Sequence, residues 1–339
     1  MADVSNQPNL REVAQVAGVS VGTISNYLNH PEKVAEATRE RISTAIEGIG
    51  WVPNVSGRIL RQGRSTLVGL VALDVTNPFF TAVARGVEDA AAESGHNIVL
   101  CNTDGVRETE ERYLWVLEEH RAAGIVITPA GGDESSLQWL RDRGMKIVLL
   151  DRARTLPNIS SVAVDDVEGG RLAGSHLLDL GHALVGFIAG PFLLQQCLDR
   201  REGLRAAVAH AGLDPDDAIV EIEAAGMRVA DGVAAVRRLL DGPRRPTALF
   251  CANDLLALGA LRLLREEGIR VPDDMALVGY DDVEYAALLE PSLTTVRQPK
   301  YELGYAAMQL LLEEIGGSED YTQTVYTPTL EVRDSTRPR

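Results

Sequence analysis

The hydrophobic residues of this chain follow two different periodicities. Between Asn9 and about residue 50, apolar side chains recur every three or four positions, which predicts short helices. From Leu67 onward, apolar runs of five to eight residues alternate with helical stretches of ten to eighteen residues, the pattern of a parallel α/β sheet. We therefore expect a small all-α head followed by a large α/β core.

The first two helices are predicted on either side of a glycine turn. Asn9 and Glu12 have the spacing of a capping box, Gly18 can end the first helix, and Ser20 can cap the second. Such a pair is compatible with a helix-turn-helix, which places its second helix in the major groove of DNA. An ordinary helical hairpin has the same pattern, so this stretch alone leaves both interpretations open.

A third helix and a basic segment complete the N-terminal part. The helix is expected from about Glu36 to Glu47, after the break at Pro31. Residues 51–65 then combine a weak helical pattern with three arginines that no acidic residue accompanies within residues 57–65. These side chains can meet phosphates, so the segment is either a short hinge helix or a flexible linker. The three arginines are Arg58, Arg61 and Arg64.

The remainder predicts two doubly wound lobes. Strands are expected at 67–75, 97–101, 124–130, 146–151 and 161–165, and in a second set at 184–190, 218–224, 247–253 and 275–282. Helices are expected between them, for example at 79–94, 108–122, 169–180, 200–211 and 255–267. Extended segments near 161–165 and 291–298 lack a full helix, which indicates that the chain passes between the lobes more than once. A cleft between the lobes, at the carboxyl ends of the strands, is the expected ligand site.

The charge of the chain is unevenly distributed. A net charge of −16 argues against a nucleic-acid partner if it is taken as an average. Residues 1–64, however, hold seven Lys or Arg and six Asp or Glu residues, so their net charge is +1 and residues 65–339 carry −17. A DNA-binding head therefore remains possible, and the acidic core would discourage nonspecific binding to DNA.

Composition and motifs exclude several classes of protein. No signal peptide or membrane span is recognisable, which favours a cytoplasmic location. Three widely spaced cysteines in apolar surroundings, Cys101, Cys197 and Cys251, are expected to be buried reduced thiols, and no metal site is expected.

No motif of an enzyme fits its required context. Residues 18–22 match G-x-S-x-G, but helices are expected on both sides, whereas a nucleophile elbow joins a strand to a helix. No G-x-G-x-x-G follows a strand, no lysine follows a glycine, and no H-E-x-x-H occurs. We therefore predict no catalytic residue, no cofactor and no enzyme activity.

Six segments of the chain resemble the lactose-repressor (LacI/GalR) family of bacterial transcription regulators, in family order and spacing. They are VAQVAGVSVGTISNYLN, TRERISTAIEGIGWVPN, VTNPFF, VLLDR, CANDLLALGALRLL and VPDDMALVGYDD. The resemblance extends over residues 9–339. It implies a helix-turn-helix head at 1–50, a hinge helix at 51–65 and a two-lobed periplasmic-binding-protein-like core at 66–339. The first lobe is expected at about 66–161 plus 294–320, and the second at about 162–293 plus 321–333.

The resemblance also implies a set of DNA-binding residues. Val21, Gly22 and Asn26 would face base edges, Ser20, Thr23, Asn29 and Asn54 would face phosphates, and Leu60 would wedge into the minor groove at the operator centre. Gly22 and Asn26 depart from the residues that many members carry. Asparagine suits adenine and arginine suits guanine, so an operator inferred from relatives need not apply to this chain. For Asn26 and Leu60, a helix-surface asparagine and plain hinge packing are the alternatives.

Residues of the cleft are implied in the same way. Effector contacts of the family are matched by five residues, which are Phe79, Asp151, Arg200, Asn253 and Asp281. Weaker candidates are Arg152 and Gln196. Carboxylates that accept hydroxyl hydrogens, together with an aromatic ring, suit a polyhydroxylated effector such as a sugar. Met227 stands where relatives often carry an aromatic ring, which leaves the effector open. For Asp151 and Asp281, strand-end capping is the alternative.

Taken together, the sequence predicts a ligand-responsive repressor that binds a pseudo-palindromic, double-stranded operator as a homodimer. The end of the chain carries no heptad helix, so a dimer is expected rather than a tetramer. The alternatives are a cytoplasmic sugar-binding sensory protein, a sugar-transport protein, a regulator that responds to a nucleobase or nucleoside, and an α/β enzyme.

Overall fold

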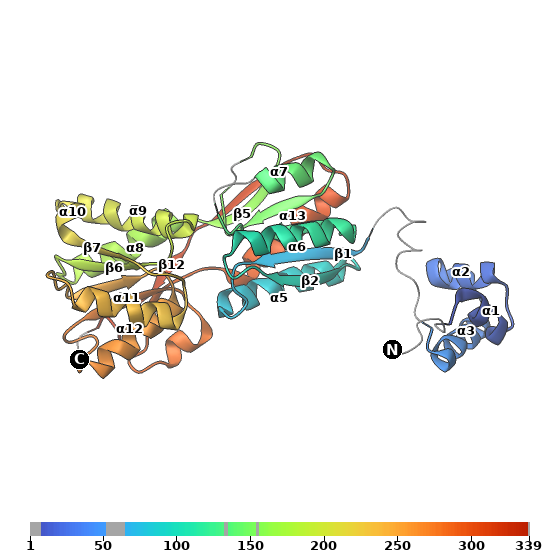
Figure 1. Cartoon of the computed structure of the whole chain (residues 1–339), viewed down its shortest axis with the longest axis horizontal. Helices are drawn as coiled ribbons and strands as arrows, with labels where there is room; N and C mark the ends of the chain where they lie inside the picture. Colours follow the sequence, from blue (N-terminus) through green and yellow to red (C-terminus); the bar gives the residue numbers. More distant parts are fainter. Residues whose placement is uncertain (1–7, 52–64, 132–134, 154–155, 338–339) are drawn as a thin grey trace. The chain divides into compact units, whose positions relative to one another are not determined.

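The computed structural model describes residues 8–51, 65–131, 135–153 and 156–337 (Figure 1). These residues form two compact units, a helical one within residues 1–64 and a larger α/β one within residues 65–339. The predicted fold class, a small all-α head and a two-lobed α/β core with two doubly wound sheets, is confirmed.

The head packs three helices around a small core. Its elements are α1 (Leu10–Ala17), α2 (Val21–Asn29), the 3₁₀ turn η1 (Pro31–Lys33) and α3 (Glu36–Ile49). Both predicted caps are present: Asn9 and Glu12 form the capping box of α1, and Ser20 Oγ accepts from the backbone N–H of Thr23 at the start of α2. Gly18 ends α1 in the left-handed conformation, with φ of 63°.

One boundary of the head needs correction. Trp51, expected in the hinge, is buried in the hydrophobic cluster of the head with Val13, Ile24 and Ile42. Its backbone N–H donates to Ile46 O, because the chain turns back after Gly50 and brings the indole onto the helices. The head therefore includes residue 51.

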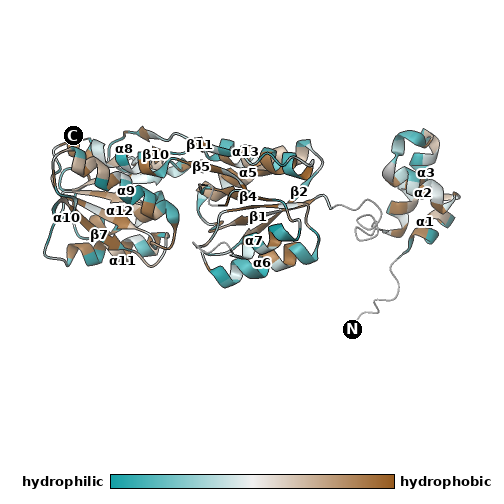
Figure 2. Ribbon diagram, turned by 90° about the horizontal axis from the view of Figure 1, so that it is seen from above, coloured by the Kyte–Doolittle hydropathy of each residue, from teal (hydrophilic) through white to brown (hydrophobic). Residues whose placement is uncertain are grey.

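The first lobe contains a six-stranded sheet in the order β11-β5-β4-β3-β1-β2, with every neighbouring pair parallel. The strands are β1 (Leu67–Ala72), β2 (Asn97–Asn102), β3 (Gly124–Ile127), β4 (Ile147–Leu150), β5 (Ser160–Val164) and β11 (Gln323–Tyr326). Helices α5 (Pro78–Glu93) and α13 (Lys300–Ile315) cover one face, and α6 (Arg107–Glu119) and α7 (Ser135–Asp142) cover the other (Figure 2).

The second lobe contains a sheet in the order β12-β10-β9-β8-β6-β7, in which only the β10–β12 pair is antiparallel. Its strands are β6 (Val185–Ala189), β7 (Ile219–Glu223), β8 (Ala248–Cys251), β9 (Ala276–Asp281), β10 (Thr294–Arg297) and β12 (Thr329–Glu331). Helices α8 (Asp166–Asp179) and α9 (Gln195–His210) pack together, as do α11 (Val229–Leu240) and α12 (Asp254–Glu266). The short helix α10 (Pro215–Ala218) and the 3₁₀ turn η2 (Glu284–Leu288) lie in the connections.

The expected lobe boundaries also need correction. β10 was expected in the first lobe, but it pairs with β9 and β12 in the second sheet. β11 was expected in the second lobe, but it pairs with β5 in the first sheet. Both strands have only four residues, and their own sequence carries no information about which sheet they join. The chain therefore crosses between the lobes three times, after β5, after β10 and after β11.

Two glycines bring α8 and α9 into backbone contact. A Cβ atom at Gly170 would overlap Arg200 O, and one at Gly203 would overlap Val167 O. Side chains at these positions would force the helices apart. The close approach places Arg200 of α9 beside the first turn of α8, which is where the candidate site begins.

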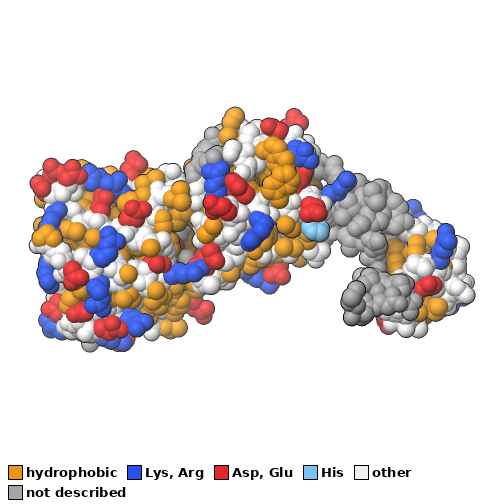
Figure 3. All heavy atoms as spheres, in the orientation of Figure 1, with side chains coloured by type: hydrophobic (Ala, Val, Ile, Leu, Met, Phe, Trp, Pro, Cys, Tyr) orange, Lys and Arg blue, Asp and Glu red, His pale blue; other side chains and the backbone are white. Residues whose placement is uncertain are grey.

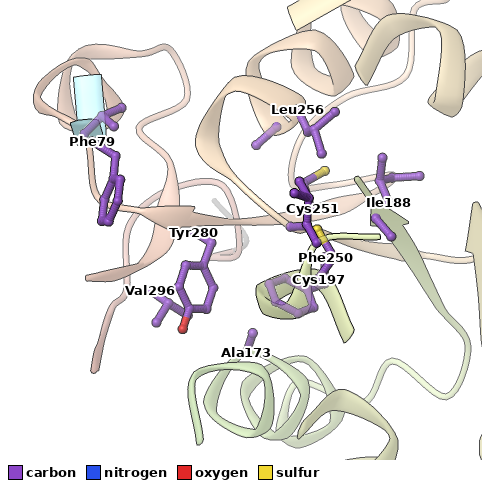
Figure 4. Packing of buried hydrophobic residues seen from close by; sticks show 14 of the residues in the cluster. Phe79, Ala173, Ile188, Cys197, Phe250, Cys251, Leu256, Tyr280 and Val296 are labelled. Carbon is purple, nitrogen blue, oxygen red and sulfur yellow. The ribbon is translucent and has the colours of Figure 1, made fainter. Parts of the chain in front are cut away.

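The core beneath the site is apolar and closely packed. Figure 4 shows Tyr280 of β9 with Ala173 of α8 and Val296 of β10, and the ring centroids of Tyr280 and Phe250 lie 6.4 Å apart. The three cysteines are free and buried, as predicted. On the surface, acidic and basic side chains are interspersed over the face of the larger unit seen in Figure 3.

Membrane-spanning helices and clusters of metal ligands can be assessed for the described parts of the chain. None of their helices is long and apolar enough to cross a membrane. Within the same residues, no group of three or more His, Cys, Asp and Glu side chains is arranged to hold a metal ion.

Candidate functional site

A cavity of about 530 Å³ lies where the carboxyl ends of the two sheets face each other. This volume is within the range of roughly 300–1,000 Å³ that is typical of small-molecule sites. Residues from both lobes line it, as the strand-end rule predicts for α/β sheets.

Six of the seven predicted effector residues line this cavity. They are Phe79, Asp151, Gln196, Arg200, Asn253 and Asp281, and Met227 lines it as well. Arg152 is not among the lining residues, and its Nη1 atom donates instead to Gly131 O at 3.0 Å. Six residues implied by the family resemblance therefore lie around one cavity, and their role in binding an effector stays a prediction.

Asp281 is a buried carboxylate at the end of β9. It accepts a hydrogen bond from Gln298 Nε2 at 2.7 Å and another from Asn77 Nδ2 at 3.3 Å, across the cleft. Burial raises the pKa of Asp281 to about 6, although the charge of Arg200 and these hydrogen bonds act in the opposite direction. Its φ of 110° is a strained value for a non-glycine residue, which is typical of functional sites.

Asp151 follows β4 and is the second buried carboxylate. Burial, reinforced by the negative charge of Asp166, raises its pKa well above the ordinary value. Its Oδ1 atom is buried and has no hydrogen-bond partner within the part of the chain that the structure describes. A buried polar atom without a partner is costly, so a ligand group that bonds to it would be favoured.

Arg200 lies between the cavity and the core of the second lobe. Its Nε atom donates to Asp166 Oδ1 at 2.8 Å and its Nη1 atom to Ala252 O at 2.6 Å, while the guanidinium lies 3.6 Å from the ring centroid of Tyr280. The arginine was predicted as a ligand donor, and the structure adds that it holds α8, β8 and β9 together. Asp166 was missed, although its place directly after the predicted strand 161–165 could have identified it.

Asn253 also has a structural role. Its Oδ1 atom caps α12 by accepting from Leu256 N at 2.8 Å, and its Nδ2 atom donates to Met227 O at 3.0 Å. The asparagine thereby fixes the loop that carries Met227 to the start of α12.

The mouth of the cavity carries charged residues that the sequence analysis missed. Asp74 and Asp104 follow β1 and β2 in the first lobe, and Arg228 precedes α11 in the second. Asp74 lies near the end of the predicted strand 67–75 and Asp104 follows the predicted strand 97–101, so the strand-end rule could have found both. Nothing local to Arg228 indicates that it reaches the other lobe.

In the head, α2 presents the predicted DNA-reading face to solvent. Val21, Gly22 and Asn26 are exposed, whereas Ile24 is fully buried beneath them. Ser20 Oγ and Thr23 Oγ1 lie 2.9 Å apart at the helix start. The side chain of Asn29, and the whole of Asn54 and Leu60, lie outside the described residues.

Comparisons with known proteins agree with both parts of the chain. The family model described as "Bacterial regulatory proteins, lacI family" matches residues 9–54, and a "Periplasmic binding protein-like domain" matches residues 174–336. The "HTH-type transcriptional repressor PurR" of Photobacterium profundum is 31% identical over 336 residues, which cover 97% of this chain and 98% of the relative. The chain belongs to the lacI family. It is a DNA-binding transcriptional repressor of that family, and these relatives confirm the prediction that it is not an enzyme.

Solved structures of the lacI family have the same architecture. The lac repressor dimer bound to operator and the anti-inducer ONPF is 26% identical, covers 98% of this chain and 99% of its own, and has a TM-score of 0.84. The transcriptional regulator CelR–cellobiose complex is 34% identical, covers 97% and 100%, and has a TM-score of 0.73. These similarities extend over the head and the core together.

Proposed function

We propose that this repressor binds a pseudo-palindromic operator as a homodimer and that a small effector in the interlobe cavity changes its operator affinity. The exposed face of α2 supports the DNA contact, because its capped start leaves Val21, Gly22 and Asn26 free of the head's core. The structural relative that was solved on operator DNA is a dimer, which supports the same assembly here.

A polyhydroxylated effector, a sugar, fits the cavity best. The observation that carries this proposal is the unpartnered, buried Oδ1 atom of Asp151 beside a second buried carboxylate, Asp281. Hydroxyl groups donate hydrogen bonds to such oxygens, and the apolar side chains of Phe79, Leu194 and Met227 can cover the carbon-bound face of a sugar ring. The CelR relative was solved with cellobiose, which supports this class.

A purine nucleobase is the second candidate. The name PurR of the relatives suggests it, and Phe79 offers an aromatic face on which a flat base could stack. Gln196 presents both a donor and an acceptor, as recognition of a base edge requires.

The effector acts in this proposal through a free energy of coupling between cavity and operator. A coupling of about 1–3 kcal/mol changes operator affinity roughly 5- to 150-fold. A ligand that prefers the DNA-bound state is a corepressor, and one that prefers the other state is an inducer.

Two experiments test the proposal. Electrophoretic retardation of the DNA upstream of the protein's own gene should detect operator binding. Asn26→Ala should weaken this retardation more than the control Gln15→Ala, which changes an exposed residue of α1. A fragment that is never retarded would refute the operator assignment.

A thermal-shift screen of sugars and purines should then identify the effector class by stabilisation through mass action. Asp151→Asn should remove the shift, whereas Asp142→Asn, on the surface of the same lobe, should preserve it. A ligand whose shift survives Asp151→Asn unchanged would exclude the proposed binding mode, and a purine as the only binder would exclude the sugar.

A further inference from the structure

The guanidinium of Arg228 bridges the two lobes at the mouth of the cavity. Its Nε atom donates to Asp74 Oδ2 at 2.8 Å and its Nη2 atom to Asp104 Oδ1 at 2.5 Å. Arg228 belongs to the second lobe and both aspartates belong to the first, at the ends of neighbouring strands. A single side chain therefore joins the lobes through two charge-assisted hydrogen bonds.

Each lobe holds its part of this contact in place. Thr76 Oγ1 donates to Asp74 Oδ1 at 2.6 Å, and Asn102 Nδ2 donates to Asp104 Oδ1 at 2.9 Å. Burial raises the pKa of Asp74, but hydrogen bonds from Arg228 and Thr76 outweigh it and lower the pKa below the ordinary value. Because the carboxylates are fixed within their own lobe, closure has to order only the arginine, which makes the contact more effective than a typical surface pair.

We propose that Arg228 is a positioning residue of the effector site, which holds the two lobes together over the cavity. The deeper contact between Asn77 and Asp281 also joins the lobes, but it is longer, at 3.3 Å, and uses the carboxylate that lines the ligand site. We call the set of Arg228, Asp74 and Asp104 the latch. It lies at the mouth of the cavity and not at its floor. The effect of this latch on effector affinity rests on the proposed function, whereas its effect on the distance between the lobes does not.

The effect on effector affinity follows from population shift. The apparent affinity of a ligand that binds only the closed state is proportional to the fraction of closed molecules. Opening the latch lowers this fraction and weakens binding by the same ratio as the fraction falls. Two exposed ion pairs of this kind contribute enough to change the open-to-closed ratio by about 2- to 30-fold. Release of the ligand should also become faster, because the mouth opens more often.

The latch can be tested without a ligand. Spin labels on introduced cysteines at Glu108 and Ala230, both exposed and close to the mouth on opposite lobes, report the interlobe distance in the full-length protein. The three native cysteines are buried. In the proposed homodimer, labels on different subunits also give distances, and proteins that carry only one of the two labels identify these.

Arg228→Ala should raise the ratio of open to closed conformers about 2- to 30-fold. The matched control is Arg237→Ala, which removes an equally exposed arginine of α11 whose partner, Glu267, lies within the same lobe at 3.2 Å. In the charge-swapped double variant Asp74→Arg with Arg228→Asp, the closed population should return in part, because one ion pair is restored while Asp104 faces a like charge. High salt should open the wild-type lobes and leave Arg228→Ala unchanged.

An interlobe distance distribution that is the same in wild type, Arg228→Ala and Arg237→Ala would overturn the latch. That result would leave operator binding and effector binding untouched, since neither is measured in this experiment. Conversely, absence of operator binding would refute the proposed function while the lobe distances still respond to Arg228→Ala.

Discussion

The buried pair of Arg200 and Asp166 makes the most demanding prediction about stability. Asp166→Asn keeps the shape of the side chain but removes the charge that faces Arg200 Nε at 2.8 Å. The arginine is only 2% exposed, so water cannot replace the lost partner. Its remaining contacts, Ala252 O and the Tyr280 ring, stabilise the guanidinium without neutralising it.

The size of the effect follows from burial. Removing one partner of a buried ion pair typically costs about 3–5 kcal/mol, because an unpaired charge is left in the interior. Since asparagine can still accept a hydrogen bond, we expect about 3 kcal/mol, the lower end of that range, for Asp166→Asn. The same helix offers a matched control in Glu168, which bonds Arg171 through both carboxylate oxygens at 2.6 Å but in an exposed position. Glu168→Gln should cost less than about 1 kcal/mol.

Urea-induced unfolding of the core, followed by tryptophan fluorescence and circular dichroism, measures both variants. A further variant, Arg200→Met combined with Asp166→Leu, should recover part of the stability lost in Asp166→Asn, because it removes both members of the buried ion pair. Equal losses for Asp166→Asn and Glu168→Gln would refute the reasoning, since the buried pair should lose clearly more than the exposed one.

Three further predictions concern packing, titration and the head. Gly86→Ala should destabilise the core by about 1–3 kcal/mol in urea unfolding, because its Cβ would overlap Tyr301 O of α13, whereas Gly48→Ala, in open space, should stabilise the head by about 0.5–1 kcal/mol. Effector affinity should fall by up to about tenfold in calorimetry from pH 7 to pH 5, because protonation of Asp281, with its pKa of about 6, weakens it as the acceptor of a ligand hydroxyl; Asp281→Asn should reduce this dependence. Ser20→Ala should destabilise the head by about 1 kcal/mol in thermal melts and weaken operator retardation.

The parts of the fold that could be predicted are those that local sequence determines. Apolar runs identified the first nine strands, and the spacing of Asn9, Glu12, Gly18 and Ser20 identified both helix starts and the turn between them. The partners of β10 and β11 could not be predicted. A four-residue strand joins whichever sheet the chain segment before it brings near, and that depends on contacts far away in the sequence.

The candidate site divides in the same way. Asp151 and Asp281 were implied by the family resemblance, and their place at the ends of apolar strands, whose carboxyl ends face the cleft, agrees with it. The roles of Arg200 and Arg228 could not be predicted. The first depends on the glycine contact that brings α8 to α9, and the second on how the two lobes close, which no local pattern records.

Asp281 connects the cavity to the segments that join the lobes. Its Oδ1 atom accepts from Gln298, in the crossover that follows β10, and Lys300 donates from Nζ to both Asp281 O and Asp282 O at 2.7 and 2.8 Å. The side chain of Asp282 in turn accepts from Arg297, at the end of β10, and from Arg333, beyond β12, each at 2.6 Å. A ligand hydrogen bond to the Asp281 carboxylate inside the cavity therefore competes with the bonds from Gln298 and Asn77, whereas the bonds from Lys300 go to backbone oxygens and those from Arg297 and Arg333 go to Asp282. Among these bonds, the one that links the carboxylate to a crossover is thus the bond from Gln298, and Gln298→Ala is the substitution that would separate the role of Asp281 in the cavity from its contact with the crossover.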